Sequence, residues 1–244
     1  MLGLFFLFLA ISLPACSLPS LPSLPFFQAP ATTTPEPLPD QTVDTLSLFV
    51  PAYATSLQPG ESVPGTGLQY IGRAGDGYEV SQDGLGATKR TGDSFYWSGV
   101  LAPGVFANYN LRLTASIFGG LPVAGPVELI VLFPQPIEGL TVDGLDSKFH
   151  FGNLLLDYKV PPGGHVPGTT LVYEGVEYQG GSDQGNKLAR FSGLSGYPYL
   201  AAGDSLVWSG SLRDNVMARF SLRTVTFDEE RIHLVGTGDL WILN

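Results

Sequence analysis

The stretch GDSFYWSGVL at residues 92–101 decides the fold, because it returns as GDSLVWSGSL at residues 203–212. Seven of the ten positions are identical. The same offset of 111 residues aligns ELIVL at 128–132 with DLWIL at 239–243. A repeat of this length indicates that one structural unit has been copied in tandem.

Upstream of this stretch the offset is smaller. VPGTGLQYIG at 63–72 matches VPGTTLVYEG at 166–175, which is an offset of 103 residues rather than 111. The second copy therefore carries eight additional residues between these two blocks. Because surface loops tolerate insertions, we expect an enlarged loop there.

Composition favours strands and argues against several kinds of ligand. Charged residues make up 14% of the 244-residue chain, whereas Gly and Pro number 31 and 20, which suits short strands joined by turns. The formal net charge of −10 argues against nucleic acid as a partner, because phosphate binding needs clustered Lys and Arg. The single Cys excludes an internal disulfide, and the three His lack neighbours at ligand spacing. We therefore expect no metal site and no cofactor.

Hydrophobic alternation predicts strands in both copies. The clearest example is 105–115, where one face of the strand is apolar with a period of two. A Gly-rich loop is expected at 72–92. The expected strands are 43–50, 68–71, 95–98, 105–115 and 127–133 in the first copy, and 148–160, 170–174, 206–209, 216–227, 231–235 and 239–243 in the second.

The sequence therefore predicts an all-β protein with two tandem β-sandwich domains, at 42–139 (the first copy) and 145–244 (the second copy). Each copy carries a turn, a short strand ending in Tyr, a Trp two residues before a Gly, and a long alternating strand. These are VPGTGLQY, WSGVLAPG and VFANYNLRLTAS in the first copy, and VPGTTLVY, WSGSL and VMARFSLRTVTF in the second. This order resembles the immunoglobulin-like β-sandwich repeats of bacterial surface proteins. The resemblance implies an extracytoplasmic spacer, adhesive stalk or carbohydrate-facing module.

The N-terminus resembles that of bacterial lipoproteins. Residues 1–15, MLGLFFLFLAISLPA, are almost wholly apolar and have the length of a signal-peptide core. The run Leu13, Pro14, Ala15, Cys16 is similar to the lipobox, at which the lipoprotein signal peptidase cleaves before a lipidated Cys. The resemblance implies lipidation of Cys16 and a stable membrane anchor, because several acyl chains hold where one is marginal. Ordinary secretion with a free Cys is the alternative.

A proline-rich tether is expected at 16–41. After the Cys the chain reads SLPSLPSLPFFQAPATTTPEPLPDQ, with seven prolines and no sustained period. Such a composition cannot form a packed core and favours extended polyproline II or disorder.

The tetrapeptide GDSL at 203–206 matches the one that names a family of esterases. The first copy has GDSF at the equivalent place and contains no His, so the two copies cannot share a catalytic Ser–His arrangement. We expect Asp93 and Asp204 to hydrogen-bond turn amides instead. We expect no catalytic residues and no enzymatic activity.

The enlarged loop of the second copy, at 177–202, is the candidate ligand-binding site. It places tyrosines among polar side chains, and flat aromatic rings beside hydrogen-bonding groups suit a sugar ring. Alternatively, the YPY sequence at 197–199 folds back as a plug over the end of the sandwich. The candidate ligand-binding residues are Tyr178, Asp183, Lys187, Arg190, Tyr197 and Tyr199.

Two functional hypotheses follow. The first is a lipid-anchored structural or interaction module on the outer face of a bacterial envelope membrane, with another envelope protein as partner. The second is a cell-surface polysaccharide-binding protein that uses the 177–202 loop to bind a glycan.

Overall fold

The structure is a computed structural model that describes residues 44–115, 120–145, 147, 149–179 and 186–243. Over these residues the chain forms strands, turns and loops but no helix, so the predicted all-β class is confirmed. In this part of the chain no helix exists that is long and apolar enough to cross a membrane. The lipobox-like sequence and the predicted tether lie outside the described residues.

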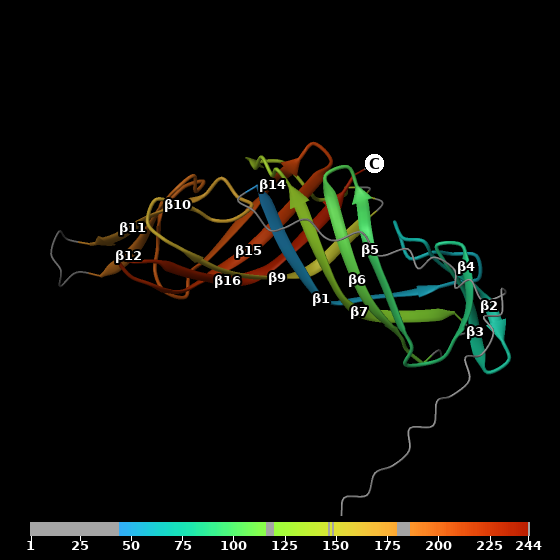
Figure 1. The fold of residues 1–244 in the computed structure, drawn as a ribbon. Helices are drawn as coiled ribbons and strands as arrows, with labels where there is room; N and C mark the ends of the chain where they lie inside the picture. Colours follow the sequence, from blue (N-terminus) through green and yellow to red (C-terminus); the bar gives the residue numbers. More distant parts are fainter. Residues whose placement is uncertain (1–43, 116–119, 146, 148, 180–185, 244) are drawn as a thin grey trace, which may run out of the picture. The chain divides into compact units, whose positions relative to one another are not determined.

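The first copy contributes four strands to a large sheet and three to a small one (Figure 1). The alternation predicted from 105 onward is confirmed, because the apolar face of β6 is buried. The Gly-rich stretch 72–92, expected to be a loop, instead contains β3 and β4. The large-sheet strands are β1 (Thr45–Leu57), β5 (Ser94–Ala102), β6 (Val105–Leu113) and β7 (Leu121–Leu132); the small-sheet strands are β2 (Leu68–Ala74), β3 (Gly77–Gln82) and β4 (Leu85–Lys89).

The second copy has a corresponding set of strands. Strands β14, β15 and β16 begin 111 residues after β5, β6 and β7, the offset of the sequence repeat. A two-residue strand, β8 (Ile137–Glu138), lies in the connection between the copies. The large-sheet strands are β9 (Phe149–Val160), β14 (Ser205–Arg213), β15 (Val216–Phe227) and β16 (Ile232–Ile242); the small-sheet strands are β10 (Gly164–His165), β11 (Val172–Tyr178), β12 (Lys187–Ser192) and β13 (Tyr199–Leu200).

The two copies share one sheet, so two separate sandwich domains are not confirmed. The nine-stranded sheet has the order β5-β6-β7-β1-β9-β16-β15-β14-β8, and β1 and β9 lie side by side at its centre (Figure 1). These two strands run antiparallel, with Phe49 opposite Leu155. Each would otherwise be the edge of its own half-sheet, with unpaired backbone groups. Because the strand order is the same on either side of this pair, the copies are arranged like the subunits of a twofold-symmetric dimer.

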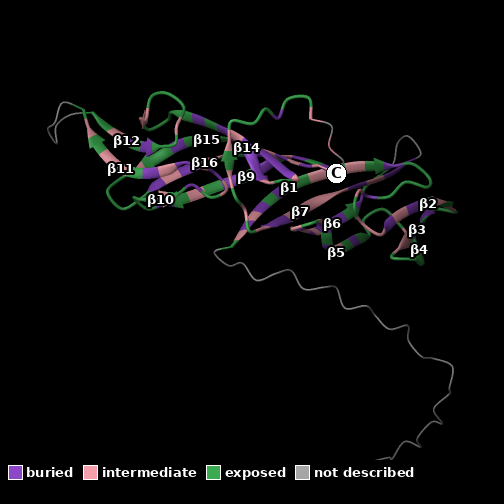
Figure 2. Cartoon of the chain, turned by 90° about the horizontal axis from the view of Figure 1, so that it is seen from above, coloured by how far each residue is buried: buried purple, intermediate pink, exposed green. Residues whose placement is uncertain are grey.

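One hydrophobic core runs through both copies (Figure 2). A Cβ at Gly65 of the first copy would lie 3.1 Å from the ring of Phe149 in β9. A Cβ at Gly168, the equivalent residue of the second copy, would lie 2.7 Å from Leu46 in β1. Both glycines have positive φ, of 77° and 74°, which a residue with a side chain adopts only with strain. The PG turn of each copy therefore packs on the first strand of the other.

The repeated tryptophans occupy equivalent places in this core. The Trp97 ring lies 5.9 Å from that of Tyr109, and the Trp208 ring lies 5.7 Å from that of Phe220, the counterpart of Tyr109. The two sites differ in burial and in one polar contact: Trp97 is partly buried, whereas the fully buried Trp208 donates its indole N–H to Thr170 Oγ1 at 3.1 Å. The first copy has Gly at the position equivalent to Thr170.

Candidate functional site

A cavity of about 530 Å³ lies beside the small sheet of the second copy. It brings together three of the six residues predicted from the sequence, namely Lys187, Tyr197 and Tyr199. Sequence reasoning did not single out Gln179, which also lines the cavity. The full lining consists of Tyr197, Tyr199, Gln179, Asn186, Lys187, Asp204, Leu188, Ala201 and Ala202.

The local strand pairing positions these side chains. The 177–202 segment, expected to be a loop, contains β12 and β13, because alternation within KLARFS buries Ala189 and Phe191 and leaves Arg190 and Ser192 exposed. Strand β12 pairs with β11 on one side and β13 on the other. The N–H of Phe191 donates to the carbonyl of Pro198 at 2.8 Å. This bond fixes the YPY sequence against β12.

Only one of the two tyrosines of the cavity has its hydroxyl anchored by a hydrogen bond among the described contacts. Their ring centroids are 5.2 Å apart, with planes inclined by 57°. Tyr199 donates its hydroxyl to Glu177 Oε2 at 3.1 Å, and this bond is the main cause of the raised pKa of Tyr199. Tyr197 is 63% exposed, so its ring is presented to solvent and does not plug the core.

Lys187 is turned partly away from the cavity that it lines. Its ammonium donates to the carbonyl of Phe227 at 2.9 Å and lies 5.3 Å from the centroid of the Phe227 ring. The Lys187 side chain therefore lines the cavity while its ammonium is hydrogen-bonded at the end of β15.

The remaining predicted residues do not line this cavity. Arg190 Nε lies 2.7 Å from Glu174 Oε2, and its Nη1 lies 3.5 Å from Glu177 Oε2. The hydroxyl of Tyr178 lies 3.5 Å from Glu229 Oε1. These contacts tie the strands of the small sheet to one another and to the turn before β16. Asp183 lies outside the described residues.

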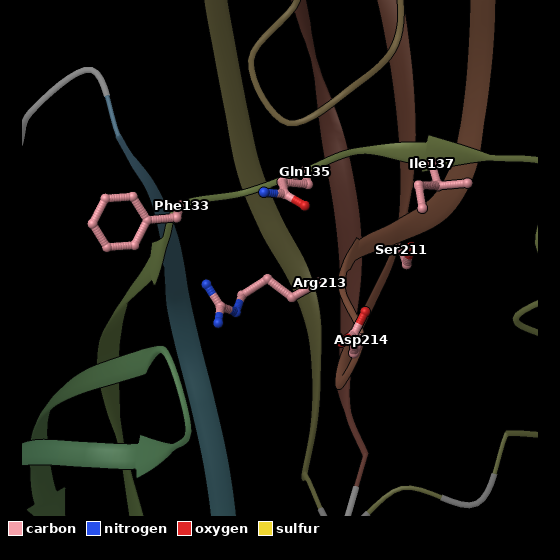
Figure 3. A pocket seen from close by; sticks show the side chains of 6 residues that line it. All are labelled: Phe133, Gln135, Ile137, Ser211, Arg213 and Asp214. Atoms are coloured by element: carbon pink, nitrogen blue, oxygen red, sulfur yellow. The ribbon is translucent and has the colours of Figure 1, made fainter.

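A second cavity, of about 280 Å³, lies where the connection after β7 passes the end of β14 (Figure 3). Sequence reasoning missed this cavity. The signal that could have found it is a difference between the copies, because Arg213 stands where the first copy has Ala102. The Arg213 guanidinium donates through Nη1 to the carbonyl of Leu132, while its buried Nε has no partner among the described residues. The lining residues are Phe133, Gln135, Ile137, Ser211, Arg213 and Asp214.

The repeated GDS sequences form turns, as predicted. Asp93 Oδ2 accepts the N–H of Arg90 at 2.8 Å, and Asp204 Oδ2 accepts the N–H of Ala201 at 2.8 Å. The following serines begin β5 and β14. Within the described ranges no group of three His, Cys, Asp or Glu residues could hold a metal ion.

Comparison of the chain with known protein families, with curated proteins and with solved structures found no match. The function must therefore be inferred from the residues and their geometry.

Proposed function

We propose that this protein is a non-catalytic interaction module, lipid-anchored to the outer face of a bacterial envelope membrane. The observation that carries the proposal is the shared core, in which Gly65 packs on Phe149 and Gly168 on Leu46. A single sheet with one core is a rigid support on which a binding surface keeps its shape. The lipobox-like run ending at Cys16 supports the anchor, and the turn role of Asp93 and Asp204 supports a non-catalytic protein.

A glycan is the second candidate partner, favoured by the cavity beside the small sheet. Tyr197 offers an exposed ring, Tyr199 lies next to it with its hydroxyl fixed by Glu177, and carboxamides and an ammonium lie around them. A pyranose ring stacks its C–H face on an aromatic ring, while its hydroxyls need donors and acceptors at the edge. The cavity supplies both kinds of contact.

Mass spectrometry of the N-terminal peptide from the membrane fraction tests the anchor. We expect a mature chain that begins at a diacylglyceryl-modified Cys16, and we expect Cys16→Ala to move the protein to the soluble fraction. Ser17→Ala is the matched control and should remain in the membrane fraction. An unmodified Cys16, or a mature chain that begins elsewhere, would exclude a lipid anchor at this residue.

Binding to an array of bacterial and host polysaccharides tests the glycan hypothesis. We expect Tyr197→Ala to weaken binding by about tenfold, the effect of losing one stacked ring. Tyr96→Ala removes a tyrosine from β5 of the first copy that is 45% exposed, and it should bind like the wild type. The hypothesis fails if the wild type retains no glycan, or if both variants bind equally well.

A further inference from the structure

The connection between the copies covers the outer edge of β14. Residues 134–139 run along this edge as an added antiparallel strand that contains β8. The contacts are Ile137 opposite Ser211, Glu138 opposite Gly210, the Gln135 N–H to the Leu212 carbonyl at 2.7 Å, and the Gly139 N–H to the Ser209 carbonyl at 3.1 Å.

The equivalent edge of the first copy is that of β5. Among the described residues β5 is the outermost strand on its side of the sheet, and Val100, the counterpart of Ser211, is 52% exposed. A Cβ at Gly210 would overlap the carbonyl oxygen of Ile137, so the close approach of β8 requires Gly there. The first copy keeps this Gly, as Gly99.

A sequence like that of the covering segment also precedes the first copy. PEPLPDQTVD at 35–44 matches PQPIEGLTVD at 134–143 with an offset of 99 residues and five identical positions. Leu38 stands where the connection has Ile137, and Glu36 stands where it has Gln135. Each copy is thus preceded by the same kind of segment.

The prolines of both segments fall on the same alternating positions. Every second residue of an antiparallel edge strand turns its N–H toward the neighbouring strand, and in the connection these donors include Gln135 and Gly139. Prolines fit only between such donors, where no N–H is needed. In the connection they are Pro134 and Pro136; in the upstream segment they are Pro35, Pro37 and Pro39, which leave Glu36, Leu38 and Asp40 as donors.

We infer that residues 35–40 pair antiparallel with the edge of β5, with Leu38 opposite Val100 and Pro39 opposite Gly99. The segment belongs to the same chain and enters β1 within a few residues, so its effective concentration exceeds that of any second copy of the protein. Four residues separate Asp40 from the start of β1, whereas nine separate its counterpart Gly139 from the start of β9. The docked segment protects β5 from pairing with another molecule, and it ends the predicted tether at about residue 34 rather than 41.

Amide hydrogen exchange of the full-length protein, measured residue by residue by NMR, tests the pairing. In this register the N–H of Val100 donates to the carbonyl of Leu38, so its exchange should be slowed roughly tenfold or more relative to an unprotected amide. Leu38→Pro removes the central donor of the segment and should restore fast exchange at Val100. The amide of Ala107 in β6, which is fully buried, should stay protected and shows that the variant remains folded.

Two matched variants sharpen this test. Pro39→Ala changes a position that faces away from β5 and should leave Val100 protected. Ile137→Pro disrupts the pairing seen at β14 and should release Ser211, which calibrates the size of the effect. Fast exchange at Val100 in the wild type overturns the inference. So does protection that survives Leu38→Pro or that grows with protein concentration, since a second molecule would then cover the edge.

Discussion

Thr170 links two polar groups that the core must satisfy, and replacing it with Val tests this role. Its Oγ1 accepts the indole N–H of Trp208 at 3.1 Å and donates to Glu138 Oε2 at 2.8 Å. Val has nearly the same shape, so the change removes the hydroxyl without opening a cavity.

The magnitude follows from the burial of the indole. Trp208 is 0% exposed, so its N–H cannot turn to water once the acceptor is lost, and a buried donor left unpaired costs about 1–3 kcal/mol. Glu138 is only half-buried, and its Oε1 lies 3.5 Å from Ser195 Oγ. Losing the hydrogen bond from Thr170 therefore costs less free energy at Glu138 than at Trp208. We expect the free energy of unfolding to fall by about 2 kcal/mol, which lowers Tm by roughly 4–8 °C in a domain of this size.

Urea and thermal unfolding, followed by tryptophan fluorescence, measure this change. Thr170→Ser keeps the hydroxyl and is the matched control, which should retain most of the stability. If Thr170→Val unfolds at the same urea concentration and temperature as Thr170→Ser, the hydroxyl does not support Trp208 and the reasoning is refuted.

Three further predictions concern the core. Tyr109→Phe should raise the free energy of unfolding by about 1 kcal/mol in urea titrations, because its buried hydroxyl has no partner among the described residues and the second copy has Phe220 there; a lower stability would contradict this. Calorimetry should show a single transition for both copies. Leu46→Ala should lower the free energy of unfolding of the whole protein by about 2–5 kcal/mol, and a half that melts independently would contradict the shared core. Burial is the main reason why the pKa of Tyr173 rises from about 10 to about 12; the neutral phenol is favoured in the folded state, so Tyr173 should leave the pH dependence of stability unchanged below pH 10 and add a decline as the pH rises toward 12. Tyr173→Phe should make this decline smaller, and an identical decline in both proteins would exclude the assignment.

The strands of the large sheet could be predicted because their signal is local. Alternation of apolar residues marks which side of a strand is buried, so the face of β6 and the limits of β15 follow directly from the sequence. The turns formed by Asp93 and Asp204 were also predictable, since Asp accepts amides of its own turn. Strand β4 was missed because its sequence is exposed and carries no such alternation. Strand β3 was missed because its alternation is short, with only Tyr78 and Val80 as buried apolar side chains.

The joining of the two copies could not be predicted in this way. It depends on two edges whose contacting residues, Phe49 and Leu155, are 106 positions apart, and no local pattern states which edge meets which. The candidate cavity was half predictable for a similar reason. The 177–202 segment contains Gln179, Asn186, Lys187 and both tyrosines, but these residues line one cavity only because β12 pairs with β11 on one side and with β13 on the other.

The packing of each PG turn on the opposite copy has a consequence for how small this fold can be. A lone copy would expose the apolar residue that the other copy now covers, Leu46 or Phe149, and could hide it again only by associating with a second identical molecule. Residues 133–148 make that association intramolecular, so the folded state does not depend on dilution.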